Sequence, residues 1–165
     1  MKKTWLQKMQ DKPGYPKVLI LQEGFPCYNA VHKMGANAGD EVVIVNPSEV
    51  LPFMAAVPQG HLITLREICL AIARKHGVQG CCSLTSGIFI MTIANAVEEV
   101  KASGENSALT RIPWWRTLKA DGFLNDKYPG GQEAHKALLE SEGFVVIARG
   151  KNYQVADLEE YLYLP

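Results

Sequence analysis

Two adjacent cysteines, Cys81 and Cys82, stand immediately ahead of a predicted helix that begins near Thr85. The amino-terminal end of a helix can lower the pKa of a thiol and favour the nucleophilic thiolate. Cysteines in such places are commonly small, buried, apolar residues instead. The pair is therefore a candidate for a cysteine nucleophile and also for part of the core.

A second group of residues is Pro113-Trp114-Trp115-Arg116, with Lys119 close behind it. Aromatic side chains stack on nucleobases, at about 1–3 kcal/mol per base. Trp114 and Trp115 could therefore form a wall against an extruded base, or they could anchor a turn in the core. Arg116 could contact a phosphate or pair with a carboxylate.

The histidines and the remaining cysteines do not have the spacing of a metal site. Cys27, His32, His61 and His76 form neither a CxxC nor an HxxxH pattern, and patterns of that kind are typical of zinc ligands. We expect no metal and no cofactor.

Length and composition limit the classes of protein to consider. The chain has 165 residues, of which 47% are hydrophobic, and its formal net charge is zero. This excludes a large multidomain enzyme and a disordered chain, and it gives no global signal for binding a polyanion. No apolar run is long enough to cross a membrane, and no apolar stretch follows the basic start of the chain. We expect a cytoplasmic protein with reduced thiols and no membrane contact.

We predict that residues 1–57 form a β-containing amino-terminal portion. A short amphipathic helix opens it, with Trp5, Leu6 and Met9 on one face. The β-branched runs 18–21 and 41–45 predict two strands that pair across an irregular connection. A helix should start near Asn46, and Pro52 should either limit it to a turn or two or make it begin late.

Residues 58–165 begin with a helix pair. Thr64 and Glu67 form a capping box for a helix over 65–76,. After a turn at 77–80, a longer helix is predicted from Thr85 to Ala102. Together they make a helix-turn-helix candidate. The side chains expected to point inward from the second helix are Ile88, Met91, Val97 and Val100.

Two hairpins and a further helix should complete the chain. Ala120-Asp121-Gly122 predicts the turn of a first hairpin, which would serve as a wing,. A helix is expected over 132–142, then a hairpin joining 144–148 to 153–155. Asp157 could cap a last helical turn that carries Leu158, Tyr161 and Leu162.

Four fragments in order resemble the DNA-binding domain of the alkylguanine-DNA alkyltransferases. They are Pro58–Thr64, Gly87–Asn95, Ile112–Arg116 and Gly130–Gly131 followed by Leu138–Gly143, and they span about half of the chain. Members of that family flip an alkylated guanine out of the duplex and move its alkyl group onto a cysteine. The resemblance implies an α/β chain with a winged helix-turn-helix domain.

The chain departs from that family at the reacting residues. Trp114 stands where the family has its nucleophilic cysteine, Trp115 replaces the base histidine, and the glutamate that orients the base falls at Lys136. An indole cannot accept an alkyl group as a thiolate does. The family's flipping tyrosine and arginine fall at Leu65 and Ser86. The residue types retained are Asn95, Pro113 and Arg116.

A tryptophan in place of the cysteine is also a feature of the alkyltransferase-like proteins, which bind alkylated DNA without repairing it. The resemblance therefore implies a non-enzymatic protein that binds double-stranded DNA, including alkylated DNA, and that recruits a repair protein. The expected base-pocket or DNA residues are Ser86, Gly87, Trp114, Trp115, Arg116 and Lys119.

Asn95 and Pro113 should support the signature turn, with the Asn95 side chain bonded to the backbone near 112–115. Two alternatives stay open. One is a protein-interaction scaffold that has lost DNA binding. The other is a divergent cysteine enzyme that uses Cys81 or Cys82.

Overall fold

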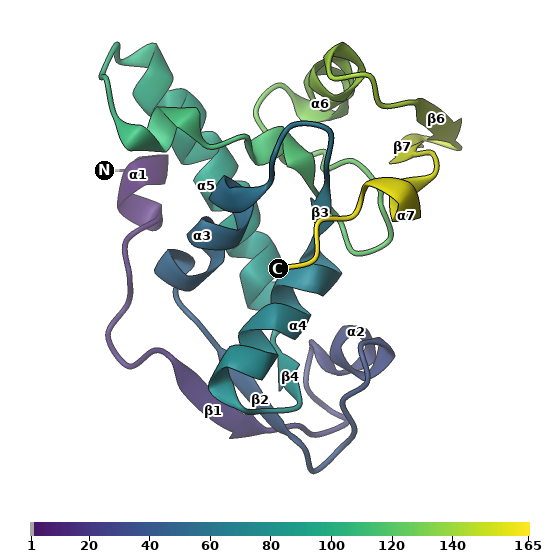
Figure 1. Ribbon diagram of the computed structural model, residues 1–165. Coiled ribbons are helices and arrows are strands. Elements are labelled where there is room, and N and C mark those ends of the chain that lie inside the picture. Colours follow the sequence, from purple (N-terminus) through teal and green to yellow (C-terminus); the bar gives the residue numbers. More distant parts are fainter. Residues whose placement is uncertain (1) are drawn as a thin grey trace.

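The computed structural model describes residues 2–165, and the long helix α5 runs through the middle of the molecule (Figure 1). Within these residues no helix is both long and apolar enough to span a bilayer. The predicted α/β class is confirmed. The helices are α1 (Trp5–Lys8), α2 (Tyr28–Lys33), α3 (Pro47–Ala56), α4 (Leu65–His76), α5 (Ser83–Ala102), α6 (Gly131–Ser141) and α7 (Leu158–Tyr161). The strands are β1 (Lys17–Ile20), β2 (Glu41–Ile44), β3 (Ile63–Thr64), β4 (Gly80–Cys81), β5 (Thr117–Leu118), β6 (Val146–Arg149) and β7 (Asn152–Val155).

The first sheet has the order β1-β2-β4. β1 and β2 pair, as predicted, and their orientation is antiparallel, whereas β4 is parallel to β2. The interval between α4 and α5 is therefore not a plain turn, because Gly80 and Cys81 within it form a strand that the sequence did not indicate. Gly80 in β4 lets α2 lie close to the sheet, since a Cβ at this position would be 2.8 Å from Cγ1 of Val31.

The amino-terminal portion shares its core with the rest of the chain. Val43, Val50 and Met54 belong to the same buried cluster as Ile68 and Ile93. The core thus continues across the boundary drawn at residues 57 and 58.

Helix α3 is longer than Pro52 suggested. It spans ten residues with Pro52 inside it. A proline in a helix removes one backbone hydrogen bond. Here Pro47 at the first turn sets the helical φ angle, and burial of Val50 and Met54 on the inner face offsets the lost bond,. The prediction of a short helix was wrong because burial outweighs the local preference.

The helix pair α4 and α5 is close to its prediction. The capping box of Thr64 and Glu67 is present, and α4 ends at Gly77 with a φ of +66°. α5 starts at Ser83, slightly earlier than expected, with Cys82 as its N-cap. Ile88 does not point inward and is 51% exposed. Phe89 and the residues that follow it at helical spacing form the buried face of α5. Ile88 comes one residue before Phe89, so its side chain points away from that face.

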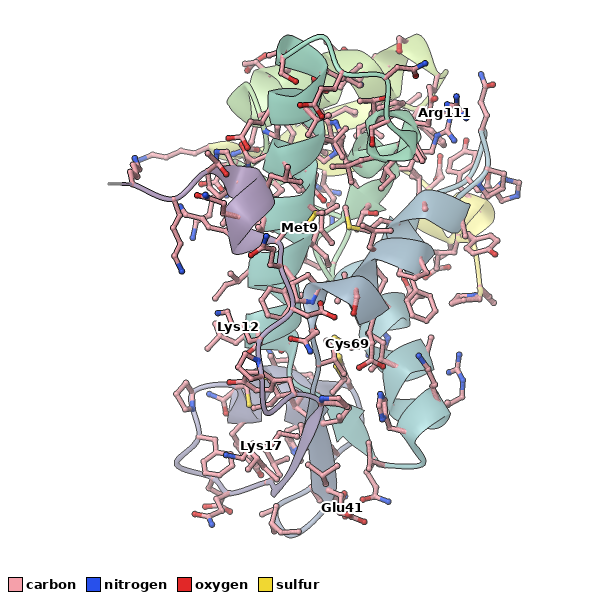
Figure 2. All side chains as sticks on the ribbon, turned by 90° about the vertical axis from the view of Figure 1, so that its left-hand side faces the viewer. Met9, Lys12, Lys17, Glu41, Cys69 and Arg111 are labelled. Atoms are coloured by element: carbon pink, nitrogen blue, oxygen red, sulfur yellow. The ribbon has the colours of Figure 1, made fainter. Side chains whose placement is uncertain are left out.

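Helix α1 lies against the carboxy-terminal half of α5, where Figure 2 shows Met9. The Glu99 carboxylate of α5 accepts hydrogen bonds from the backbone amides of Trp5 and Leu6, at 3.1 and 3.0 Å. Leu6 itself is 41% exposed, so the predicted common apolar face does not include it.

The wing is a turn whose two arms pair with different strands. The Gly122 amide donates to the Lys119 carbonyl at 2.9 Å, as a tight turn requires. β5 is parallel to β3, whereas Phe123 bridges Gln154 of β7. The predicted turn is present, and the Lys119 amide donates across it to the Phe123 carbonyl at 3.0 Å. Beyond this bond the two arms pair with β3 and β7 and not with each other.

The end of the chain follows its prediction closely. α6 and the antiparallel hairpin β6–β7 are confirmed. Asp157 precedes α7, with a φ of 55° and no side-chain cap bond, so its capping role was wrong.

Candidate functional site

An open pocket of about 800 Å³ lies along the first half of α5. We call it the α5 pocket. Its walls come from α2, the amino-terminal ends of α4 and α5, the turn after β5, and the loop at 125–127. Pockets of this size are typical of ligand sites.

The floor of the α5 pocket is apolar. Leu84 and Ile88 lie one turn apart on α5 and are 53% and 51% exposed. Met91 continues the same face, and Leu65 and Met34 close it from α4 and the end of α2. The floor therefore offers contact area for a flat or apolar group.

Four cationic residues belong to the same lining. Lys33 comes from α2 and Arg66 from α4, and Lys119 and Lys127 come from the segment after β5. Arg66 donates to the Lys33 carbonyl at 3.4 Å, which joins α4 to α2. Asp121 is the acidic residue in the lining.

Lys119 is close to a second carboxylate outside the pocket lining. Its Nζ lies 3.4 Å from Oδ1 of Asp126, and the two side chains are 48% and 58% exposed. An ion pair this exposed is weak, so the charge of Lys119 stays available to another partner. The rim is positive even though the whole chain is neutral.

Gly87 and Lys119 are the predicted site residues that lie in this pocket. A Cβ at Gly87 would be 3.7 Å from Cδ2 of Leu65, which is ordinary van der Waals contact. Ser86 is not in the pocket. It is buried, with its Oγ 3.4 Å from Sγ of Cys81, so its prediction as a DNA contact was wrong. It faces inward because Phe89 and Ile90 fix the buried face of α5.

Trp114 is not an open stacking wall. It is 1% exposed, and its Nε1 donates to Glu98 at 3.0 Å. Its ring meets those of Trp115 and Tyr128 edge to face. The short 3₁₀ turn at Trp114–Arg116 directs the indole into the core against α5. Its assignment to a base pocket was therefore wrong, and the packed alternative holds.

Arg116 is also occupied within the protein. Its guanidinium donates two hydrogen bonds to the Glu142 carboxylate, at 2.9 and 2.6 Å, and a third to the Val57 carbonyl at 2.9 Å. These bonds hold the pKa of Glu142 below its ordinary value. Trp115 is half-buried beside Arg116, outside the α5 pocket lining. Neither residue has the predicted role at that pocket.

His135 is a buried residue that no pattern in the sequence singled out. Its Nε2 donates to the Trp115 carbonyl at 2.8 Å, and its Nδ1 accepts from the Asn125 amide at 3.2 Å. Both bonds need the neutral ring with its proton on Nε2. Burial lowers the pKa of His135 to about 4, so the ring stays neutral at pH 7.

Asn95 and Pro113 hold parts of the backbone in place. Asn95 donates to the carbonyls of Met91 and Lys127, at 2.9 and 3.0 Å. The expected bond to residues 112–115 was therefore wrong, because the loop that carries Lys127 comes closer to α5. Pro113 is buried, and its carbonyl accepts from the Arg116 amide at 3.0 Å, so it supports the signature turn.

The cysteines do not form a reachable nucleophile. Cys81 and Cys82 are 2% and 5% exposed. A hydrogen bond from Cys69 lowers the pKa of Cys81, but the sulfur faces the core. Among residues 2–165, no group of three or more histidine, cysteine or acidic side chains is placed to hold a metal.

No protein-family model matches the chain, and no curated protein matches it significantly. Two solved structures are similar to it. One is S. pombe Atl1 in complex with damaged DNA containing O6-carboxymethylguanine, with 20% identity, 72% of this chain and 94% of that chain covered, and a TM-score of 0.48. The other is S. pombe ATL in complex with DNA, with 21% identity, the same coverage of both chains and a TM-score of 0.48.

Proposed function

We propose that this chain is a non-enzymatic protein that binds double-stranded DNA at the α5 pocket. The observation that carries the proposal is the arrangement of four cationic side chains around an apolar floor, beside the first turns of α5. Lysine and arginine at the rim fit phosphates, and the apolar floor fits bases. Asn29 of α2 and Asn125 add polar groups to the same lining.

The state of Trp114, Cys81 and Cys82 supports a binding role. Trp114 has no group that accepts an alkyl carbon, and the Cys81 and Cys82 sulfurs face away from the α5 pocket into the core. An alkylated base as ligand belongs to this proposal, since a pocket of about 800 Å³ has room for an extruded base with its substituent. A repair protein as partner is a further part of the proposal.

The test is a titration of labelled duplexes, one normal and one with an alkylated guanine, at two salt concentrations. Binding should weaken steeply as salt rises, because phosphate contacts release counterions. The double variant Lys119→Ala/Lys127→Ala should weaken both duplexes and reduce the salt slope by about 2, near 1 for each lost phosphate contact.

Lys17→Ala/Lys151→Ala is the matched control. It also removes two exposed cations, and both lie outside the α5 pocket lining. The control should bind DNA as the wild type does. If the wild-type protein binds neither duplex at low salt, the proposal fails.

A second candidate function is a protein-interaction scaffold, which the exposed Leu84 and Ile88 favour. Large apolar side chains on a surface commonly mark contacts with another protein. Such a contact would depend little on salt. The titration separates the two functions, because a scaffold predicts no salt-sensitive binding of duplex DNA.

A further inference from the structure

Helix α5 begins without a side-chain cap. The backbone amides of Ser83, Leu84 and Thr85 lie in its first turn, and the first bond of the helix joins the Ser86 amide to the Cys82 carbonyl at 3.1 Å. The Cys82 side chain caps none of the three earlier amides, and no other group within residues 2–165 accepts from them. The start of α5 therefore keeps free donors at the positive end of a long helix.

Ser83 is an independent sign of a ligand at this place. The residue is only 5% exposed, and its hydroxyl has no hydrogen-bond partner within the part of the chain that the structure describes. The unpartnered side-chain atoms sealed inside that part belong to Trp115 and Thr117. Ser83 is in the α5 pocket lining and is not one of the sealed groups, so its hydroxyl reaches the pocket. A polar group buried to this degree normally has a partner.

Helix α2 adds a positive charge and another donor beside Ser83. Val31 of α2 and Cys82 belong to one buried cluster, so α2 lies against the residue that precedes Ser83. Asn29 and Lys33 are separated by one turn of α2, and both are exposed residues of the pocket lining. The pocket thus has donors from α2 and from the start of α5.

We propose that the start of α5, together with Ser83 and Lys33, is a binding site for a phosphate monoester. Free amides at a helix start bind phosphate, because the N–H donors and the helix dipole both favour an anion. A monoester has three acceptor oxygens and a charge of about −1.5 to −2 at pH 7, so it can use more donors than a phosphodiester can. The inference rests on the proposed function in one respect, namely that the phosphate belongs to a nucleotide, either free or at the end of a DNA strand.

The floor of the α5 pocket fits the rest of such a nucleotide. Leu84 directly follows Ser83, Ile88 lies one turn further along α5, and both are half-exposed. Apolar walls with a few polar groups at one place are typical of small-ligand sites. The acidic residue of the lining, Asp121, comes from the turn after β5, so neither α2 nor α5 adds a carboxylate to the lining.

Inorganic phosphate is the first probe, and amide NMR spectra of the full chain report its binding. Sodium phosphate replaces chloride at constant ionic strength near neutral pH. The signals of the Ser83 and Leu84 amides should shift along one saturating curve. The Arg66 amide at the start of α4 should shift little, because the Thr64 hydroxyl already accepts from it at 3.2 Å. Shifts at Ser83 and Leu84 no larger than that of Arg66 would overturn the proposal.

The variant Lys33→Ala/Ser83→Ala should weaken phosphate binding about tenfold or more, because a charge and a hydrogen bond to the anion are both lost. Ser141→Ala/Lys151→Ala is the matched control. It also removes one hydroxyl and one cation, and both residues are exposed and outside the pocket lining. Circular dichroism should show the same fold for both variants. Equal phosphate binding by the two would also overturn the proposal.

Two pairs of ligands identify the carrier of the phosphate. One pair is a duplex with 5′-phosphate ends and the same duplex with 5′-hydroxyl ends, and the other is adenosine monophosphate and adenosine. A preference for the phosphorylated duplex that Lys33→Ala/Ser83→Ala removes would assign the site to a strand end. A preference confined to adenosine monophosphate would assign it to a free nucleotide.

The same ligands separate this inference from DNA binding itself. If both duplexes bind equally in a salt-sensitive way, and adenosine monophosphate binds no better than adenosine, the phosphate site is wrong and DNA binding stands. If adenosine monophosphate binds and neither duplex does at low salt, DNA binding fails and the phosphate site stands.

Discussion

The signature turn at Trp114–Arg116 and the α5 pocket differ in what their side chains are free to do. The turn has the residue types associated with recognition, yet Trp114 is bonded to Glu98 and Arg116 to Glu142. The α5 pocket has ordinary leucine, isoleucine and lysine side chains, and these remain open to solvent. Residue type sets what a side chain could bind, but its burial and existing partners decide whether it is available.

The largest expected effect concerns Trp114. Trp114→Ala should lower the free energy of unfolding by about 3–5 kcal/mol, because it removes a fully buried aromatic side chain. Urea denaturation followed by circular dichroism measures this. The folded fraction should bind DNA as the wild type does. Weaker DNA binding at unchanged stability would instead place Trp114 in the binding site.

The second-largest effect on the free energy of unfolding is expected at Arg116. Arg116→Met leaves the Glu142 carboxylate partly buried without its partner, so the free energy of unfolding should fall by about 3 kcal/mol. Arg116→Met/Glu142→Leu should recover much of this loss. A loss below about 0.5 kcal/mol, as for an exposed ion pair, would contradict the structural role.

The pH dependence of stability tests the neutral state of His135. Burial lowers the pKa of His135 from 6.5 to about 4 in the folded protein. The unfolded chain therefore binds a proton first as the pH falls, and stability should drop by about 2 kcal/mol between pH 7 and pH 5. Below about pH 4.5 the lowered pKa of Glu142 should add a further loss.

His135→Gln is the comparison variant for this pH range. It should be less stable at pH 7, because it disturbs the bonds to Trp115 and Asn125. Its stability should change less between pH 7 and pH 5. An equal slope in both proteins would show that another group accounts for the pH dependence.

The smallest expected effect on stability is at the floor of the α5 pocket. Leu84→Ala and Ile88→Ala should each change the free energy of unfolding by less than about 0.5 kcal/mol, as exposed substitutions usually do. The same urea titration measures this. Losses above about 2 kcal/mol would show that these side chains are part of the core, and the contrast with Trp114 would disappear.

Local chemistry explains what the sequence could predict. The capping box of Thr64 and Glu67 involves residues only three apart at the start of α4, and the left-handed Gly77 ends the same helix. Each is a local pattern, so both ends of α4 could be predicted from the sequence. Ile88 could not be placed correctly, because an apolar residue at the edge of a helical face changes side with a shift of one residue.

Contacts between distant segments explain what the sequence could not predict. Trp114 bonds to Glu98, and Arg116 bonds to Glu142. These partners are 16 and 26 residues away in the sequence, so no local sequence pattern indicates either pair. The wall that α2 adds to the α5 pocket was missed for another reason. Its six residues are too few to show a helical period within the irregular stretch at 24–40,.

The place of β2 between β1 and β4 has a consequence for how the protein unfolds. β4 follows α4 in the chain and pairs with β2, so the sheet joins the start of the chain to the helix pair. Residues 1–57 and 58–165 would each lose a strand partner if they were separated. We expect the whole chain to melt in one cooperative transition, and neither fragment to keep its structure alone.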